Sequence, residues 1–346
     1  MIIAGERADA AWIDDPAARL ERKNSFDASL TIGAARFNRD TGRLTSNSRP
    51  FLWAIDKETG LIRSDLARPR RCPVCDESPG PELFVKDGFR HVRCRNCGLI
   101  YVSLVLREDV MEKYWREEMT WMSILNSEPQ IELDRRKFQY GLELAAARVK
   151  GRSVLDVGSG NGVFVRVAAE AGWESAALEL NRESGEKMEA EGFRVIVKRL
   201  ETAGLPSGSF DLITFWEVLE HLPDPRMTLA EARRLLVDDG IFLIMTPNVD
   251  SMVTRLLHDR SNTFGGHSHL NHFSPSTMNA LLEKAGLKAL EMETVITELG
   301  AINNYLSFED PYDGEAEAFM PELTPALIHE RLWGSRLLTL AARGDL

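Results

Sequence analysis

The feature that most constrains this chain is a short apolar strand that ends beside an acid and runs into a glycine-rich loop. Residues Val154–Gly162 read Val-Leu-Asp-Val-Gly-Ser-Gly-Asn-Gly, so that Gly158, Gly160 and Gly162 lie within five positions. Glycine lets the backbone turn sharply from a strand into a helix while it approaches a ligand closely. In a doubly wound sheet such a loop lies at the carboxyl edge of the strands, where ligands bind. The loop therefore predicts an α/β protein with a bound ligand.

The pattern after residue 150 alternates between strands and helices. Strands are expected at 153–157, 174–180, 194–197, 210–215, 241–245 and 289–295, and helices at 163–171, 182–191, 227–236 and 276–285. Short apolar strands that alternate with helices predict a mostly parallel sheet with helices on both faces. The expected fold class is therefore α/β and doubly wound.

A second acid narrows the type of ligand. Glu179 ends the next predicted strand, about 20 residues after the first glycine, where a carboxylate holds the ribose hydroxyls of a nucleoside cofactor. A nicotinamide dinucleotide is the rival, but its G-x-G-x-x-G spacing would need a glycine where Val163 stands. The third glycine falls one position early, at Gly162. This spacing favours a cofactor without a pyrophosphate.

From about residue 135 to 295 the chain resembles the class I S-adenosylmethionine-dependent methyltransferases. The resemblance rests on four motifs in the family's order, which are Val154–Gly162, Ala177–Asn181, Phe210–Leu222 and Leu235–Ile241. It implies a Rossmann-like, mostly parallel seven-stranded sheet, and it implies S-adenosylmethionine as the methyl donor.

The resemblance also implies which residues bind the cofactor. The loop glycines border the methionine part and Glu179 binds the ribose. Leu200 and Glu201 border the adenine, and Trp216 lines the side of the sulfonium and the substrate. Asp156 supports the loop more than it touches the ligand. The full implied set is Asp156, Gly158, Ser159, Gly160, Gly162, Glu179, Leu180, Leu200, Glu201 and Trp216.

The four cysteines of the chain form one C-x2-C-x18-C-x2-C pattern. Cys72 and Cys75 are the first pair, and Cys94 and Cys97 are the second. Two tight turns that each present two thiolates complete a tetrahedral zinc shell. Because such a shell has no open position, the predicted zinc is structural rather than catalytic. Two disulfides are the alternative, which the absence of a secretory segment disfavours.

Four histidines are candidates for acid–base work. His221 follows the fourth strand of the predicted sheet, and His267, His269 and His272 lie between the fifth strand and the next helix. Imidazole suits the removal of a hydroxyl proton near neutral pH. His269 and His272 match an H-x-x-H-F-S feature of small-molecule methyltransferases with zinc ribbons, so we assign catalysis to His221, His269 and His272. Structural hydrogen bonding stays open. A catalytic metal is disfavoured because no carboxylate is obviously paired with these histidines.

The chain divides into five expected regions. These are an N-terminal appendage at 1–70 with hairpin-like turns at 39–44 and 56–61, a zinc ribbon at 71–103, a helical linker at 104–150, the methyltransferase domain at 151–295, and an extension at 296–346 that is acidic up to about Glu322, then helical, and covers the substrate.

Charge and hydropathy restrict the partners. The formal net charge of -11 opposes nonspecific attraction to nucleic acid and to anionic membranes. We find no signal peptide pattern and no apolar run of about 18 residues, so a cytoplasmic protein without a membrane partner is expected. The oligomeric state stays open.

A four-cysteine ribbon ahead of a class I domain looks like bacterial methyltransferases that modify small molecules. O-methylation of a sugar, a polysaccharide precursor or another metabolite is the leading hypothesis, with C-methylation of a keto-sugar kept open. A zinc-ribbon ribosomal-RNA base methyltransferase is the enzyme rival. The acidic charge disfavours RNA, as does the Trp216–Leu219 stretch, which replaces a base-binding tetrapeptide. A catalytically inactive, cofactor-binding regulatory protein is the third alternative, and the intact cofactor acids disfavour it.

Overall fold

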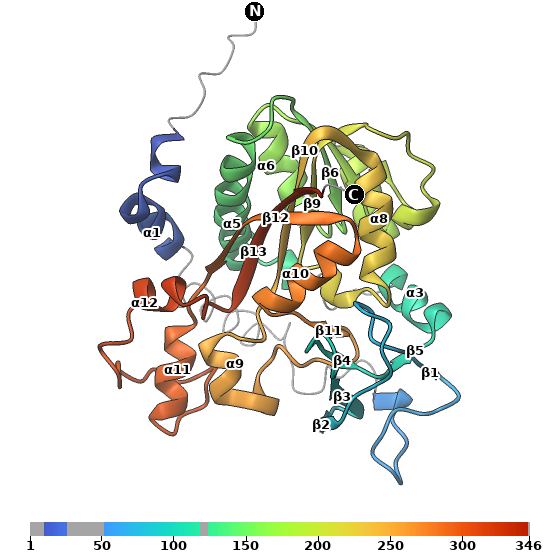
Figure 1. The fold of residues 1–346 in the computed structure, drawn as a ribbon, viewed down its shortest axis with the longest axis vertical. Coiled ribbons are helices and arrows are strands. Elements are labelled where there is room, and N and C mark those ends of the chain that lie inside the picture. Colours follow the sequence, from blue (N-terminus) through green and yellow to red (C-terminus); the bar gives the residue numbers. More distant parts are fainter. Residues whose placement is uncertain (1–9, 26–51, 118–123, 345–346) are drawn as a thin grey trace, which may run out of the picture.

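The computed structural model describes residues 10–25, 52–117 and 124–344. Its centre is a seven-stranded sheet in the order β12-β13-β10-β9-β6-β7-β8 (Figure 1). The strands are β6 (Ser153–Val157), β7 (Glu174–Leu178), β8 (Arg194–Ile196), β9 (Phe210–Trp216), β10 (Leu236–Pro247), β12 (Leu287–Val295) and β13 (Arg336–Arg343). The strands from β8 to β10 pair in parallel, while β13 runs antiparallel to both β10 and β12. The predicted mostly parallel, seven-stranded fold is confirmed.

Helices cover both faces of the sheet. Helices α5 (Glu128–Ala146) and α6 (Val163–Glu170) lie on one face, and α8 (Pro225–Leu235) and α10 (Pro275–Lys284) lie on the other (Figure 1). Alternate residues of a strand point to opposite faces. Val154 thus joins the core under α5 and α6, whereas Leu155 joins the core under α8 and α10. Helix α7 (Arg182–Ala190) follows β7. Helix α5, expected in a linker, is part of the packed domain.

The C-terminal segment differs from the expectation. The expected helix after Glu322 is present as α12 (Pro325–Glu330), but residues 336–343 form strand β13, where a helix was expected. Leucine and alanine in β13 favour helix locally, but pairing with strands on both sides overrides that preference. The central residues of β13, numbers 337 to 341, are buried. The seven-stranded sheet is therefore completed by residues beyond 295.

The cysteine region forms a small sheet that shares a strand with the large domain. Its order is β11-β4-β3-β2, with β2 (Glu82–Lys86), β3 (Phe89–Arg93), β4 (Ile100–Val102) and β11 (Asn271–His272). A two-stranded ladder of β1 (Ala67–Pro69) and β5 (Leu104–Leu106) flanks it. Val74, Leu99 and Tyr101 are buried in the same core as the α8 side of the large sheet. The ribbon is thus packed against the domain that contains the large sheet.

The N-terminal appendage contains a helix that was not expected. Helix α1 (Pro16–Asn24) follows the short η1 (Ala10–Ile13), because Asp15 caps its first turn and Pro16 suits that turn. Arg19 pairs with Glu291 and Glu293 on β12. The expected bend at 56–61 is present between the bridged residues Ile55 and Ile62, and the one at 39–44 lies outside the described residues.

The remaining helices flank these units. They are α3 (Glu108–Glu117), α9 (Met252–Leu257) and α11 (Leu299–Leu306), with the short turns η2 (Leu52–Ala54), η3 (Leu200–Thr202), η4 (Leu219–His221) and η5 (His258–Arg260). Helices α9, α11 and α12 share a small apolar core (Figure 1). Within the described residues, no helix combines the length and apolar character needed to cross a membrane.

Candidate active site

The glycine loop has the backbone geometry that its sequence predicts. Gly158, Gly160 and Gly162 have φ angles of 74°, 55° and 77°, in the left-handed region that favours glycine. A Cβ atom at Gly158 would lie 2.7 Å from Val218 Cγ2, and one at Gly162 would lie 2.6 Å from Met188 Sδ. The loop therefore needs glycine for its backbone angles at all three positions, and for space at the first and third.

Glu179 and the loop form one site. The Glu179 carboxylate accepts hydrogen bonds from Gly160 N and Asn181 N, each at 2.7 Å. Burial raises the pKa of this carboxyl above its usual value. The structure thus brings together the loop and the acid that the sequence assigned to one cofactor. Leu180, beside it, is partly exposed.

Asp156 and Ser159 support the loop from inside. The Asp156 side chain is buried and accepts a hydrogen bond of 2.6 Å from Thr214 Oγ1 on β9. Burial raises the pKa of Asp156 to about 7. Ser159 Oγ donates to the Asp156 carbonyl at 2.9 Å. These contacts are those of a supporting group, as the sequence predicts for Asp156.

Of the residues assigned to the adenine and the sulfonium, Leu200 and Trp216 are buried and Glu201 is partly exposed. Leu200 is buried in the core, and the Glu201 carboxylate accepts a hydrogen bond from Thr228 on α8. Trp216 packs against Phe138 and Phe164, with ring centroids 4.6 and 5.4 Å apart. The indole is thus a core group between α5 and α6. Contact between these residues and a bound cofactor stays a prediction.

Two of the predicted catalytic histidines meet beside a buried acid. His221 and His269 have ring centroids 4.9 Å apart, and one ligand atom of each lies within 4.8 Å of a Glu220 carboxylate oxygen. His221 Nδ1 donates to Ser268 O, and His269 Nδ1 donates to Thr263 O, both at 2.9 Å. Each ring thereby keeps Nε2 as its acceptor atom. Glu220, His221 and His269 are named here the acceptor cluster.

Burial controls the ionisation of the acceptor cluster and keeps its two imidazoles in the neutral form, which can accept a proton or bind a metal. Both Glu220 oxygens are buried without a hydrogen-bond partner among the described residues, and burial raises the pKa of this carboxyl well above its usual value. Burial lowers the pKa of His221 and lowers that of His269 to about 3. Both imidazoles are therefore neutral at pH 7. One carboxylate and two imidazoles are ligands that a divalent transition metal accepts, so the cluster could also hold a cation.

A group of charges borders the cluster. Glu217, at a φ of 56°, pairs with Arg336 of β13 and lies 3.7 Å from Lys137 Nζ of α5. Burial alone would raise the pKa of Glu217, but the two cations lower it to about 2. Asp134 holds Lys137 at 2.7 Å. A non-glycine residue at positive φ at the end of a strand is typical of functional sites.

These charged residues were missing from the sequence-based site. Glu217 and Glu220 stand in the quoted motif Phe210–Leu222, where their spacing from His221 was the available signal. No sequence pattern marked Lys137 or Arg336, because they reach the site from a distant helix and from an unexpected strand.

His272 lies apart from the acceptor cluster. It is buried beside the ribbon, with its ring centroid 5.1 Å from that of His91 on β3. Neither ring nitrogen has a hydrogen-bond partner among the described residues. The structure therefore groups His269 with His221 and leaves His272 at the contact with the ribbon. A direct catalytic role for His272 stays a prediction without support from this geometry.

The four cysteines converge as their spacing predicts. Cys72 Sγ lies 3.5 Å from Cys97 Sγ, and Cys75 Sγ lies 3.4 Å from Cys94 Sγ. All four sulfur atoms are within 4.8 Å of one another. A zinc tetrahedron with bonds of about 2.3 Å has sulfur–sulfur edges of about 3.8 Å, so the donor set fits this ion.

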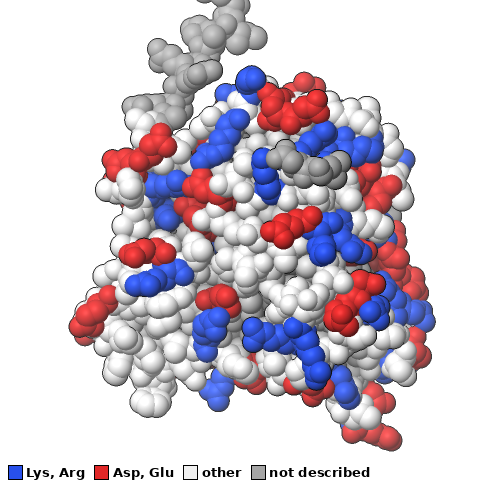
Figure 2. Space-filling view, in the orientation of Figure 1, with Lys and Arg blue, Asp and Glu red and all other residues white. Residues whose placement is uncertain are grey.

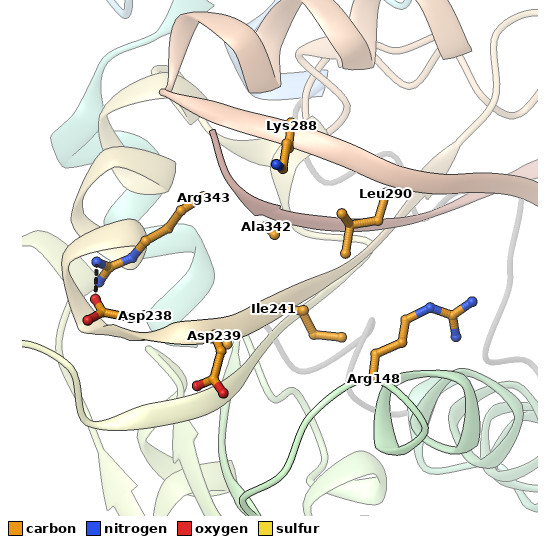
Figure 3. Close-up of a pocket in the computed structure, with 9 residues that line it drawn as sticks. Arg148, Asp238, Asp239, Ile241, Lys288, Leu290, Ala342 and Arg343 are labelled. Atoms are coloured by element: carbon orange, nitrogen blue, oxygen red, sulfur yellow. Dashed lines mark hydrogen bonds and ion pairs between the residues drawn. The ribbon is translucent and has the colours of Figure 1, made fainter. Parts of the chain in front are cut away.

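A surface pocket of about 550 Å³ lies toward the amino ends of the parallel strands (Figure 3). It is lined by Arg148 after α5, by Ile241 and Ala342 in the sheet, and by Asp238 and Arg343, which pair with each other. Asp238 is near the amino end of β10, whereas the glycine loop follows the carboxyl end of β6. This pocket is therefore remote from the cofactor loop.

The fold and the glycine loop have the features expected of a class I S-adenosylmethionine-dependent methyltransferase domain. Residues 130–292 match the family described as "Methyltransferase domain". The chain is 29% identical over 157 residues to the ubiquinone biosynthesis O-methyltransferase of Bordetella avium, a match that covers 41% of this chain and 65% of the relative. It is 27% identical to the enzyme of the same name from Methylococcus capsulatus, covering 44% and 69%.

Among solved structures, the chain is similar to the 1,6-didemethyltoxoflavin-N1-methyltransferase of Burkholderia thailandensis with bound 1,6-didemethyltoxoflavin and S-adenosylhomocysteine. The two share 15% sequence identity and a TM-score of 0.47, over 77% of this chain and 100% of that one.

Proposed function

We propose that this protein transfers the methyl group of S-adenosylmethionine to an oxygen of a small-molecule acceptor. The observation that carries the proposal is the 2.7 Å bond between Gly160 N and the Glu179 carboxylate, which joins the two cofactor elements into one site. The two relatives described above are named as O-methyltransferases, which supports an oxygen acceptor. Within this class we favour a hydroxylated metabolite such as a sugar or a polysaccharide precursor.

The acceptor cluster supplies the base in this proposal. S-adenosylmethionine, when bound, supplies an electrophilic methyl group on sulfur. A neutral His221 or His269 takes the proton of the acceptor hydroxyl at Nε2 as the oxygen–carbon bond forms and the sulfur–carbon bond breaks. The backbone carbonyls that hold both Nδ1 atoms keep the rings oriented for this step. S-adenosylhomocysteine and the methyl ether are the products.

The four cysteines are proposed to hold one structural zinc ion. Their sulfur–sulfur distances support this, and four reduced thiolates suit a reducing, cytoplasmic environment. Metal analysis of protein purified under reducing conditions should find about one equivalent of zinc. Absence of zinc from folded protein would refute this assignment.

RNA is the rival acceptor. Positive and negative side chains alternate on the face of the molecule in Figure 2, which does not favour a track for phosphates. Salt-sensitive binding to ribosomal-RNA fragments, together with methylation of RNA, would replace the small-molecule proposal.

The decisive experiment is a screen for methyl gain. Wild-type protein is incubated with S-adenosylmethionine and pooled metabolites that include sugars and nucleotide sugars, and mass spectrometry then detects products heavier by one methyl group. The Glu179→Ala variant is the control, because it should bind the cofactor about tenfold more weakly. At a limiting S-adenosylmethionine concentration, we expect clearly more product from the wild type than from the variant. Failure of every metabolite and RNA pool would favour an inactive cofactor-binding protein.

A further inference from the structure

The cysteine ribbon continues into the loop that carries His269. Strand β4 of the ribbon pairs with β11, so that Asn271 lies opposite Tyr101. Val102 N donates to Leu270 O at 2.9 Å, and Leu270 N donates to Glu220 O at 2.7 Å. A continuous path of backbone hydrogen bonds thus leads from the ribbon to the acceptor cluster.

A single buried side chain holds this junction. Arg70, two residues before Cys72, is 8% exposed. It donates to Val102 O at 2.8 Å, to Pro223 O at 3.1 Å and to Asn271 Oδ1 at 2.9 Å, and it also donates to Leu270 O. One guanidinium therefore joins the ribbon, the segment after η4 and the histidine loop.

Asn271 extends the same junction. Its Nδ2 donates to Leu219 O at 2.9 Å and to Leu222 O at 2.8 Å, at either end of η4. Glu220 and His221 lie in that turn, and His269 lies two residues before Asn271. The two halves of the acceptor cluster are thus held together through Asn271, which Arg70 orients.

The hydrogen-bond partners of Arg70 indicate that it does more than fill space in the core. All four are neutral oxygens, and none is a carboxylate among the described residues. A buried cation without an ion-pair partner is costly unless its donors are satisfied. An apolar side chain would fill the space at lower cost, but it could not bond three segments.

We infer that Arg70 is a positioning residue through which the cysteine ribbon sets the geometry of the acceptor cluster. The expected effect of Arg70 on turnover rests on the proposed function. The expected effect of Arg70 on the structure of the cluster does not. Among the described residues, Arg70 shares no hydrogen bond with the glycine loop or Glu179, so cofactor binding should depend on it less than the acceptor cluster does. The ribbon then serves acceptor chemistry rather than cofactor binding.

Arg70→Met tests the inference, with Arg71→Met as the matched control. Arg71 is the next residue, and among the described residues its exposed side chain bonds within the ribbon, to Asp76 and to Ser78 Oγ. We expect Arg70→Met to speed amide hydrogen exchange in peptides covering 217–224 and 265–274 about tenfold or more, with unchanged exchange in 154–163. The affinity for S-adenosylhomocysteine, measured by calorimetry, should stay within about twofold. Arg71→Met should change none of these.

Turnover supplies the second readout. With the acceptor found by the screen, kcat should fall about tenfold or more in Arg70→Met and stay unchanged in Arg71→Met. If Arg70→Met does not fold, Arg70→Lys keeps the charge with fewer donors and should show the same pattern in weaker form. Equal exchange in both variants, or parallel loss of S-adenosylhomocysteine binding, would overturn the inference. Should no acceptor exist, the proposed function fails while the exchange result still decides the role of Arg70.

Discussion

The proposed cofactor end and the proposed acceptor end of this site are built in different ways. At the cofactor end, Gly160 meets Glu179 only 19 positions further along the chain. At the acceptor end, Glu217 pairs with Arg336 across 119 positions, and Arg70 bonds Leu270 across 200. One end is a local strand-loop-helix unit, and the other is assembled from segments that meet only in the folded protein.

The two ends therefore depend on different structural features. The cofactor end relies on backbone angles that glycine permits and on one strand-end acid. The acceptor end relies on buried side chains, and neighbouring charges determine whether these side chains are ionised. Arg336 and Lys137, for example, lower the pKa of Glu217. Substitutions in distant elements should therefore disturb the acceptor end more than the cofactor end.

The largest expected effect is at the acceptor end. His269→Ala should lower kcat about 100- to 10,000-fold, because a positioned base contributes that much. The affinity for S-adenosylhomocysteine should change by less than about twofold. His267→Ala, in the same loop, is the control and should keep turnover. Steady-state kinetics and calorimetry measure both properties, and equal losses in the two would indicate a folding role for His269.

The next prediction concerns the strand that brings Arg336 to the site. Leu338→Ala in β13 should lower the free energy of unfolding by about 2 to 5 kcal/mol, because the side chain is 2% exposed in the core. Met320→Ala, at an exposed position, should cost under about 1 kcal/mol. Urea denaturation compares them. A small loss at Leu338 would mean that β13 is dispensable for the sheet.

A pH-dependent prediction concerns the cofactor end. Burial raises the pKa of Asp156 from 3.8 to about 7, so the folded protein keeps a proton that the unfolded chain releases in this range. The stability from this group is complete below pH 3.8 and is lost as the pH rises through 7. Between about pH 5 and pH 8, the unfolding free energy of the wild type should therefore fall about 2 to 3 kcal/mol more than that of Asp156→Asn.

Cofactor-free protein is denatured in urea at both pH values for this comparison. Asp238→Asn, at a fully exposed position, is the control and should follow the wild type. Parallel curves for the wild type and Asp156→Asn would show that Asp156 is ionised in the folded protein.

The smallest expected effect is the loss of one cofactor contact. Glu179→Ala should weaken S-adenosylhomocysteine binding about tenfold, or ~1.4 kcal/mol, because two ribose hydroxyls lose their acceptor. Glu183→Ala, on the exposed side of α7, is the matched control and should bind normally. Calorimetry measures both. Unchanged affinity in Glu179→Ala would refute the ribose assignment.

Individual residues show which features of the site could be predicted from the sequence. The three glycines, Glu179 and the four cysteines were predicted, and the structure brings each set together. The role of Trp216 on the substrate side stays a prediction, and the structure adds that its ring packs against Phe138 of α5 and Phe164 of α6. The pattern of apolar residues predicts a strand and the residue at which it ends. It does not predict which residues from other segments pack around a side chain of that strand.

The sequence by itself determined the doubly wound sheet, the cofactor loop and the cysteine cluster. Each is encoded by residues a short distance apart, whose backbone angles or spacing allow few alternatives. Only the tertiary structure decided that residues 336–343 insert as a strand, that Glu220 joins His221 and His269, and that Arg70 ties the ribbon to them. These features depend on burial and on pairing between distant segments, which override local propensity and leave no local pattern.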